Sequence, residues 1–225
     1  MLALFAQSEL KDLVEKVEKG ERLDFEAGVR MMNSQDILAL GYMANLVRER
    51  KNGNKTYFMV NGTMNPLNVC ADGPNTTMFY GDTETTEERI DFLILLRAMQ
   101  DRSVGFQSFS PLPDDPENTH FEGTMGVGTT TGIEDLKVLA ISRILLDNFD
   151  HIKAYWLMLG PKLAQVSLAF GVDDLDGTVV EERIFHSAEA EKDQPMSKQA
   201  LIQMIQKAGR DAVERDALYR VIRTY

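Results

Sequence analysis

The sequence KAYWLMLGPKLAQVSLAFG, residues 153–171, decides the fold of this chain. Its first part, 153–158, is rich in aromatic and apolar residues, which favours a short β-strand. Pro161 then predicts the start of a helix, because proline lacks the N–H that a first turn would leave unpaired, and Gly171 predicts its end. A strand that leads directly into a helix is the repeating unit of a parallel α/β sheet.

Three similar strand-like segments occur earlier in the chain, at 56–61, 76–80 and 105–109. Helix signals follow the last two. Thr85 with Glu88, and Thr131 with Glu134, form capping boxes in which hydroxyl and carboxylate each satisfy a backbone N–H that is otherwise unpaired. This alternation predicts an α/β fold with about four strands.

Both ends of the chain show the periodicity of helices. Residues 7–52 carry apolar side chains at helical spacing, and a last helix is predicted between Ser197 and Gly209. The sequence therefore divides into an N-terminal helical region at 1–54, an α/β region at 55–188 and a C-terminal helical extension at 189–225.

Composition narrows the classes of partner. With 225 residues and 44% apolar content the chain can bury a core, and its net charge of -11 repels phosphate backbones and anionic membrane surfaces. We expect no nucleic-acid or membrane partner. No signal peptide and no apolar run of spanning length is found, so we expect a cytoplasmic protein. A single cysteine, Cys70, forms no internal disulfide, which fits a reducing compartment.

Residues 151–182, which contain the deciding segment and continue to VDDLDGTVVEE, closely resemble the C-terminal part of the aminodeoxyfutalosine synthases. These are radical S-adenosylmethionine enzymes of the futalosine route to menaquinone. Further segments look like the same family: 38–50, 60–70, 77–89 and 106–119.

The resemblance implies a (β/α)8 barrel that holds a 4Fe-4S cluster on three cysteines, spaced C-x3-C-x2-C, just after its first strand. It also implies that the cluster cleaves S-adenosylmethionine. The adenosyl radical then adds to 3-[(1-carboxyvinyl)oxy]benzoate, a small-molecule substrate.

The chain departs from this pattern after its first strand. Cys70 stands at the place of the first cluster cysteine, but Pro74 and Thr77 stand where the second and third would be. From Ala71 the sequence passes to what resembles the sixth barrel strand, so strands two to five are missing. We expect an incomplete (β/α) barrel of the radical SAM type, and we expect that this chain alone binds neither the 4Fe-4S cluster nor S-adenosylmethionine. Cys70 is either a remnant metal ligand or an ordinary small residue.

The junction at 70–76 predicts a rearranged sheet. Residues 72–75 read as a tight turn, too short for a parallel crossover, which takes about a dozen residues. We expect that segments 56–61 and 76–80 do not both keep the parallel arrangement, so that one is displaced or the two pair antiparallel. An open arc leaves unpaired edges, which predicts a homodimer.

Four residues are candidates for binding the substrate. Tyr80, Gln107 and Tyr155 lie on strand-like segments, where core packing is the alternative because the sequence does not give the phase of the strands. Lys162 lies at a helix start, where it would bind an anion such as a carboxylate; the alternative is a solvated lysine.

The acidic residues and the histidines carry weaker signals. Asp173, Asp174 and Asp176 could hold a hard metal ion, although such a cluster is usually a solvated turn, and the histidines lack the spacing of a zinc site. Three functional hypotheses therefore stay open. The chain is a family transferase with impaired activity, a non-catalytic remnant that binds a small carboxylate, a nucleoside or a partner subunit, or an internally deleted product without a selected role.

Overall fold

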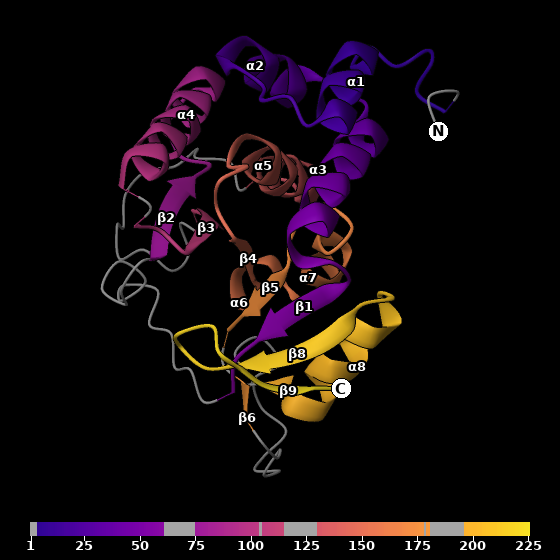
Figure 1. Ribbon diagram of the computed structural model, residues 1–225, viewed down its shortest axis with the longest axis vertical. Coiled ribbons are helices and arrows are strands. Elements are labelled where there is room, and N and C mark those ends of the chain that lie inside the picture. The colour runs from indigo at the N-terminus through magenta and orange to yellow at the C-terminus, as the bar shows by residue number, and fades with distance from the viewer. Residues whose placement is uncertain (1–3, 61–74, 104, 115–129, 178, 181–195) are drawn as a thin grey trace.

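The structure is a computed structural model, and it describes residues 4–60, 75–103, 105–114, 130–177, 179–180 and 196–225. Its centre is a seven-stranded sheet with the strand order β2-β3-β4-β5-β1-β8-β9 (Figure 1). The strands of this sheet are β1 (Lys55–Phe58), β2 (Asn75–Tyr80), β3 (Ser108–Pro113), β4 (His151–Tyr155), β5 (Asp174–Asp176), β8 (Asp211–Arg215) and β9 (Val221–Thr224). Every pairing in it is parallel except that of β8 with β9. The predicted α/β class is confirmed, as a partial parallel sheet that does not close into a barrel.

Helices cover one face of the sheet in two layers. The helices are α1 (Lys11–Lys19), α2 (Phe25–Asn33), α3 (Ile37–Asn52), α4 (Thr86–Ser103), α5 (Gly132–Leu145), α6 (Trp156–Leu159), α7 (Pro161–Ser167) and α8 (Lys198–Lys207). Helices α5, α7 and α8 contact the strands, while α1, α2 and α3 pack around α5 or on each other. A small separate sheet pairs β6 (Val179–Val180) with β7 (Met196–Ser197).

The caps expected from the sequence fix where the helices begin. The Thr131 hydroxyl accepts a hydrogen bond from the Glu134 N–H at 3.2 Å, at the start of α5. Thr85 and Glu88 form the reciprocal pair at the start of α4, with distances of 2.7 and 3.2 Å. Pro161 occupies the first turn of α7. Each cap satisfies backbone donors that a helix leaves unpaired.

The face of the sheet that packs on the helices, here called the helix face, is apolar. Alternate strand residues point to it and are buried: Phe58, Phe109, Ile152, Ala154 and Leu175 are at most 1% exposed. Burial of each large side chain stabilises the fold by roughly 1.5–3 kcal/mol. The opposite face, here called the polar face, carries the alternate residues of the same strands and holds the candidate site.

The expectation that segments 56–61 and 76–80, on either side of the junction at 70–76, do not both keep the parallel arrangement is wrong. Strands β1 and β2 both run parallel in one sheet, and they are separated by β3, β4 and β5. The tight turn is not the whole connection, because β1 ends at Phe58 and β2 begins at Asn75. Residues 59–74 are long enough for a parallel crossover, which needs about a dozen residues. Their course, apart from 59–60, lies outside the described residues.

Two regions contain strands that the sequence pattern missed. The expected acidic turn at 173–177 contains β5, whose three residues are buried. The range 189–225 contains the expected helix, α8, but also β8 and β9, so it is not a helical extension alone. The sheet therefore has more than the predicted four strands, and the domain boundaries at 55 and 189 stay predictions.

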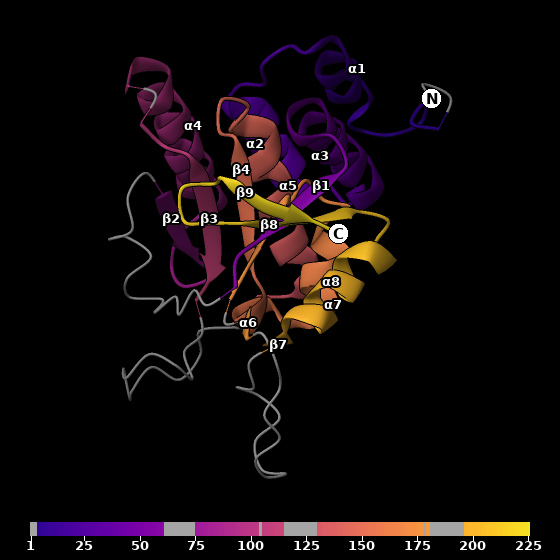
Figure 2. The ribbon, with the colours of Figure 1, turned by 60° about the horizontal axis from the view of Figure 1, so that its bottom comes forward.

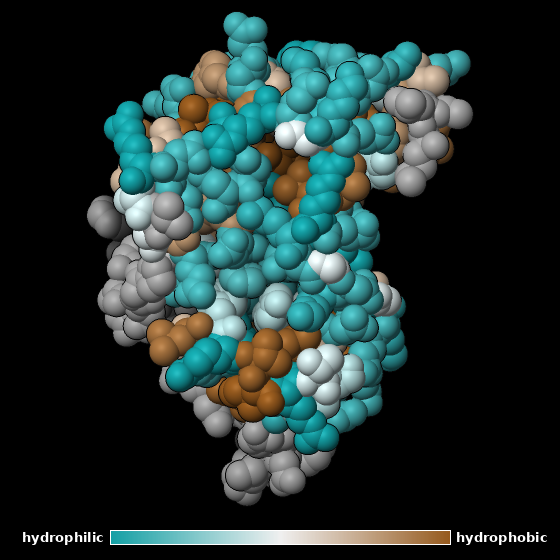
Figure 3. All heavy atoms as spheres, in the orientation of Figure 1, coloured by the Kyte–Doolittle hydropathy of each residue, from teal (hydrophilic) through white to brown (hydrophobic). Residues whose placement is uncertain are grey.

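The face of the molecule seen in Figure 3 is mostly hydrophilic, with a hydrophobic patch over the C-terminal hairpin of β8 and β9. Leu218, Val221 and Ile222 are between 53% and 63% exposed there. Within the part of the chain that the structure describes, no helix has the length and apolar character to cross a membrane.

Candidate functional site on the polar face of the sheet

Strand alternation places charged side chains on the polar face. In β4, Lys153 points to it while Ile152 and Ala154 point to the helices. In β5, Asp174 and Asp176 share that face, because Asp174 lies opposite Lys153 in the register. These residues are buried, with exposures of 0–5%.

Two ion pairs cross this face. Lys153 Nζ donates to Asp176 Oδ2 at 3.0 Å, and the Arg215 guanidinium donates twice to Asp174 Oδ2 at 2.9 and 2.6 Å. Burial alone would lower the pKa of Arg215, but Asp174 outweighs it, so the pKa is raised above its ordinary value. The four buried charges cancel.

A further cluster of polar side chains, formed by Arg143, His151 and Asp173, links the start of β4 to the residue before β5. His151 Nδ1 lies 2.6 Å from Asp173 Oδ2, and the Ile152 N–H donates to Asp173 Oδ1 at 2.9 Å. The fully buried guanidinium of Arg143 also donates to Asp173. Burial lowers the pKa of Arg143, and Asp173 opposes that change. Residues at the amino ends of parallel strands usually stabilise a barrel rather than react, so we assign this group to stability.

The C-terminal hairpin covers part of the polar face (Figure 2). The Tyr219 ring stacks on the His151 ring at a centroid distance of 4.0 Å. The Arg215 guanidinium also lies over the Tyr219 ring, 4.0 Å from its centroid. Tyr219 has a positive φ of 58°, which is unusual for a residue with a side chain. The Asp216 carboxylate holds this turn, since it accepts bonds from the Leu218 and Arg220 N–H groups, both at 2.9 Å.

The carboxyl ends of β4 and β5 meet beside Trp156. A Cβ on Gly177 would lie 2.3 Å from the indole Nε1, so only glycine fits at this position, whose φ is 145°. The indole N–H is buried, and no residue in the described part of the chain accepts a hydrogen bond from it. Active sites of (β/α) barrels lie at this end of the strands.

The structure brings only one of the four substrate-binding candidates onto the polar face. Tyr155 lies there, opposite Asp176. Burial, and to a smaller extent the negative charge of Asp176, raises the pKa of its phenol. Tyr80 lies on the helix face, where its hydroxyl donates to Asp135 Oδ1 at 2.8 Å. Gln107 precedes β3 and is half-buried, while Lys162 is exposed in the first turn of α7. Cys70 lies outside the described residues.

Sequence reasoning did not place Lys153, Asp174, Asp176, Arg215 and Tyr219 on one face of the sheet. It considered Asp174 and Asp176 only as ligands of a hard metal ion or as part of a solvated turn. The signal for the first three was present, because HIKAY and DLD alternate polar and apolar residues with the period of a strand. Arg215 and Tyr219 follow from the C-terminal strands, which the pattern did not predict.

The donors in this chain do not fit an iron-sulfur cluster. The sequence has one cysteine, and within the described residues no group of three or more histidine, cysteine, aspartate or glutamate side chains could hold a metal ion. Asp173, Asp174 and Asp176 are not a solvated turn, since each faces a cation or a histidine. A cluster of this kind is normally held by thiolates on its irons, which this chain alone does not supply.

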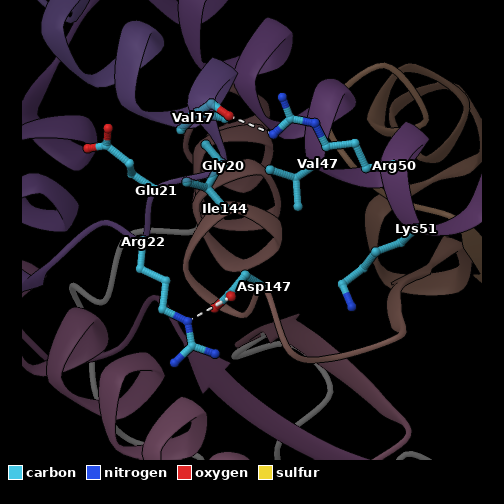
Figure 4. A pocket seen from close by; sticks show the side chains of 9 residues that line it. All are labelled: Val17, Gly20, Glu21, Arg22, Val47, Arg50, Lys51, Ile144 and Asp147. Atoms are coloured by element: carbon cyan, nitrogen blue, oxygen red, sulfur yellow. Dashed lines mark hydrogen bonds and ion pairs between the residues drawn. The ribbon is translucent and has the colours of Figure 1, made fainter.

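A pocket of about 180 Å³ lies on the opposite side of the molecule, among the helices (Figure 4). Arg50 and Arg22 line this pocket, but the guanidinium groups of both already bind groups of the protein itself. Arg50 donates to the Val17 and Glu18 carbonyls at 2.6 and 2.7 Å, and Arg22 binds Asp147 at 2.8 Å. We therefore place the candidate site on the polar face.

Known proteins resemble the chain in sequence and in fold. The aminodeoxyfutalosine synthase of Thermus thermophilus is 50% identical over 152 residues, which are 67% of this chain and 41% of that protein. The 5-amino-6-(D-ribitylamino)uracil--L-tyrosine 4-hydroxyphenyl transferase 1 of Methanosarcina acetivorans is 45% identical over 148 residues, 64% of this chain and 40% of that protein. The chain thus spans about two-fifths of the length of these curated relatives.

A solved structure supports the fold. The FeFe-hydrogenase maturase HydG from Carboxydothermus hydrogenoformans aligns with a TM-score of 0.60 over 97% of this chain and 83% of that chain, at 11% identity. A likeness at this identity concerns the fold alone. The sequence match is more specific, because the model of the CofH/MqnC C-terminal region matches residues 103–224, more than half of the chain. The chain belongs to the CofH/MqnC family.

Proposed function

We propose that this chain is an aminodeoxyfutalosine synthase-like protein of menaquinone biosynthesis that binds a small substrate on its polar face and does not perform the radical reaction on its own. The observation that carries the proposal is the contrast between two parts of the molecule. The polar face has an ordered set of buried charges, Lys153 with Asp176 and Arg215 with Asp174. The thiolates for the cluster are missing from the sequence, which has only Cys70.

Similarity supports the substrate class. The relative of 50% identity is an aminodeoxyfutalosine synthase, and the matched family model covers 103–224, which includes β4, β5 and β8. In the proposed role these strands keep their part of a binding surface. If ancestral transferase activity persists, its cluster ligands and the missing strands come from another polypeptide.

The first experiment tests the cluster. We expect protein that is reconstituted anaerobically with iron and sulfide to be colourless and free of bound iron after desalting, because one thiolate per chain is too few. Brown protein with about four irons per chain would contradict the proposal. Cys70→Ser is the control for iron that binds adventitiously to the single thiol.

The second experiment tests substrate binding. We expect 3-[(1-carboxyvinyl)oxy]benzoate to raise the melting temperature, because a ligand that binds only the folded state stabilises it by mass action. S-adenosylmethionine should have no effect. If neither compound changes the melting temperature at millimolar concentration, the binding role is wrong and the hypothesis of a product without a selected role gains support.

A further inference from the structure

The pocket among the helices, near the ends of α1, α3 and α5, has room for a small molecule. Its volume of about 180 Å³ is comparable to that of an engineered apolar cavity of about 150 Å³ that holds benzene. Apolar walls are provided by Val17, Val47 and Ile144 (Figure 4). The side chains of Lys51 and Asp147 also line the pocket and are 24% and 33% exposed, so solvent reaches it.

The side of the pocket formed by α3 has an excess of positive charge. Arg50 donates to two backbone carbonyls, at 2.6 and 2.7 Å, and these carry no net charge. Lys51 has an ion pair with Asp150 at 3.7 Å, a distance too long for a hydrogen bond. The Asp150 side chain is 69% exposed, so water screens this pair. Burial lowers the pKa of Lys51, which indicates that its ammonium group is poorly solvated.

The opposite side has an excess of negative charge. Arg22 binds two carboxylates, those of Asp101 and Asp147, at 2.6 and 2.8 Å, so one guanidinium balances two charges. Glu21 lies on the same side and adds a third carboxylate, although its side chain points away from the pocket (Figure 4). The Lys51 side chain extends into the pocket from α3, and Asp147 lies on the other side of it (Figure 4).

A ligand with both charges fits this pocket better than a ligand with one. An anion would be attracted by Lys51 but repelled by Asp147, and a cation would meet the reverse. A zwitterion can direct its carboxylate to Lys51 and its ammonium group to Asp147. An aliphatic side chain on the same ligand would lie against the apolar walls and leave water.

We propose that this pocket is a second binding site, which takes a small aliphatic zwitterion such as a branched-chain amino acid. Lys51 binds the carboxylate, Asp147 binds the ammonium group, and the apolar walls contact the side chain. The site is separate from the polar face of the sheet. It therefore goes beyond the proposed function and does not depend on it.

The experiment compares L-leucine with three compounds that each lack one of its groups. Isocaproate lacks the ammonium group, isoamylamine lacks the carboxylate, and glycine lacks the side chain. Full-length protein with ¹³C-labelled isoleucine methyl groups is titrated, and the Ile144 resonance, assigned with Ile144→Val, reports binding in the pocket. We expect leucine to move this resonance in a saturable way. The three other compounds should bind at least about tenfold more weakly, because each loses a charged hydrogen bond or the apolar contact.

Each other result overturns the proposal. Isocaproate that binds as tightly as leucine would show a site for anions, and isoamylamine that does so would show a site for cations. Glycine that binds as tightly would remove the apolar walls from recognition. An Ile144 resonance that stays in place up to the solubility limit of leucine would show that the pocket does not bind this class of ligand.

A variant tests the positive side of the pocket. Lys51→Met keeps most of the side-chain length but removes the charge, so leucine should bind at least about tenfold more weakly and isoamylamine no more weakly than before. The matched control is Lys11→Met, at an exposed lysine at the other end of α1, and it should bind leucine like the unaltered chain. Equal leucine affinity in Lys51→Met and the unaltered chain would refute the proposal. If Lys51→Met does not fold, the comparison of the four compounds in the natural protein still decides.

Discussion

Buried charges dominate this molecule at the scale of single residues. Asp173 satisfies the Arg143 guanidinium, the His151 ring and a backbone N–H at once, and both Asp173 and Arg143 are 0% exposed. Such a group adds little stability when complete, because desolvation offsets much of the attraction. It becomes strongly destabilising when one member is removed.

Asp173→Ala is therefore expected to lower the free energy of unfolding by about 3–5 kcal/mol, because it leaves Arg143 buried and uncompensated. Urea denaturation followed by circular dichroism measures the change. The matched control is Asp12→Ala, which breaks an Asp–Arg pair with Arg30 in which the Asp12 side chain is 55% exposed. That variant should lose about 1 kcal/mol or less. Equal losses for the two variants would show that burial does not control the effect.

At the scale of elements, a salt-bridge network ties α4 to the segments around it. Arg22 donates to both oxygens of Asp101 at 2.6 and 2.9 Å, and Asn148 donates to the same carboxylate at 2.8 Å. The hydrogen bonds from Arg22, and to a smaller extent the one from Asn148, lower the pKa of Asp101 to about 2. The network joins α4 to the connection before α2 and to the one after α5.

This lowered pKa predicts how the network responds to acid. The contribution of Asp101 to stability is complete above the unfolded pKa of about 3.9 and is lost as pH falls through about 2, the folded value. An NMR titration of the Asp101 carboxyl should have its midpoint near that lower value. Arg22→Met should move the midpoint back toward about 3.9. An Asp101 midpoint that stays in place in this variant would show that Arg22 is not the cause.

The cap of α5 is a second prediction at this scale. Thr131→Ala removes the acceptor for the Glu134 N–H and should lower the free energy of unfolding by about 1 kcal/mol. Thr131→Asp should restore most of the loss, because aspartate is also a good N-cap. Differential scanning calorimetry of the three proteins measures the changes. If the alanine and aspartate variants melt alike, the capping bond does not contribute.

The elements differ in how well the sequence predicts them. The starts of α4, α5 and α7 follow from local chemistry, namely a capping box, the Thr131 cap and Pro161, and the structure confirms these starts. The capping box expected at α5 is only half formed, because the Glu134 carboxylate binds Arg89. Strand β5 was missed because aspartate is rare in strands, and what stabilises it there comes from other strands: Lys153 of β4 and Arg215 of β8. Local propensity does not contain such non-local pairings. The charged residues of the site were missed for the same reason, since they meet only when β4, β5, β1 and β8 are assembled in one sheet.

The whole molecule is an arc of sheet with two ends. Strand β2 ends it on one side and β9 on the other, and the hydrophobic patch of Leu218, Val221 and Ile222 lies on the β9 side. Edge strands with exposed apolar residues favour association. The homodimer expected from the sequence therefore remains a prediction.

Size-exclusion chromatography with light scattering tests whether the chain forms a homodimer. We expect a mass of twice 25.3 kDa at micromolar concentration, and a shift to the monomer in Val221→Lys and Ile222→Lys. Leu38→Lys, at an exposed residue of α3 away from this hairpin, is the control and should stay dimeric. A single species at 25.3 kDa for the unaltered chain would exclude the dimer.

The position of β1 sets a condition on how the chain is made. This strand leaves the ribosome well before its neighbours in the sheet, which are β5 and β8, near residues 174 and 211. At about 5–20 residues per second, translation needs roughly eight to thirty seconds to deliver both. Until β5 is made, the nascent strand has neither of its neighbours in the sheet, so a delay in synthesis between β1 and β5 should increase its dependence on chaperones.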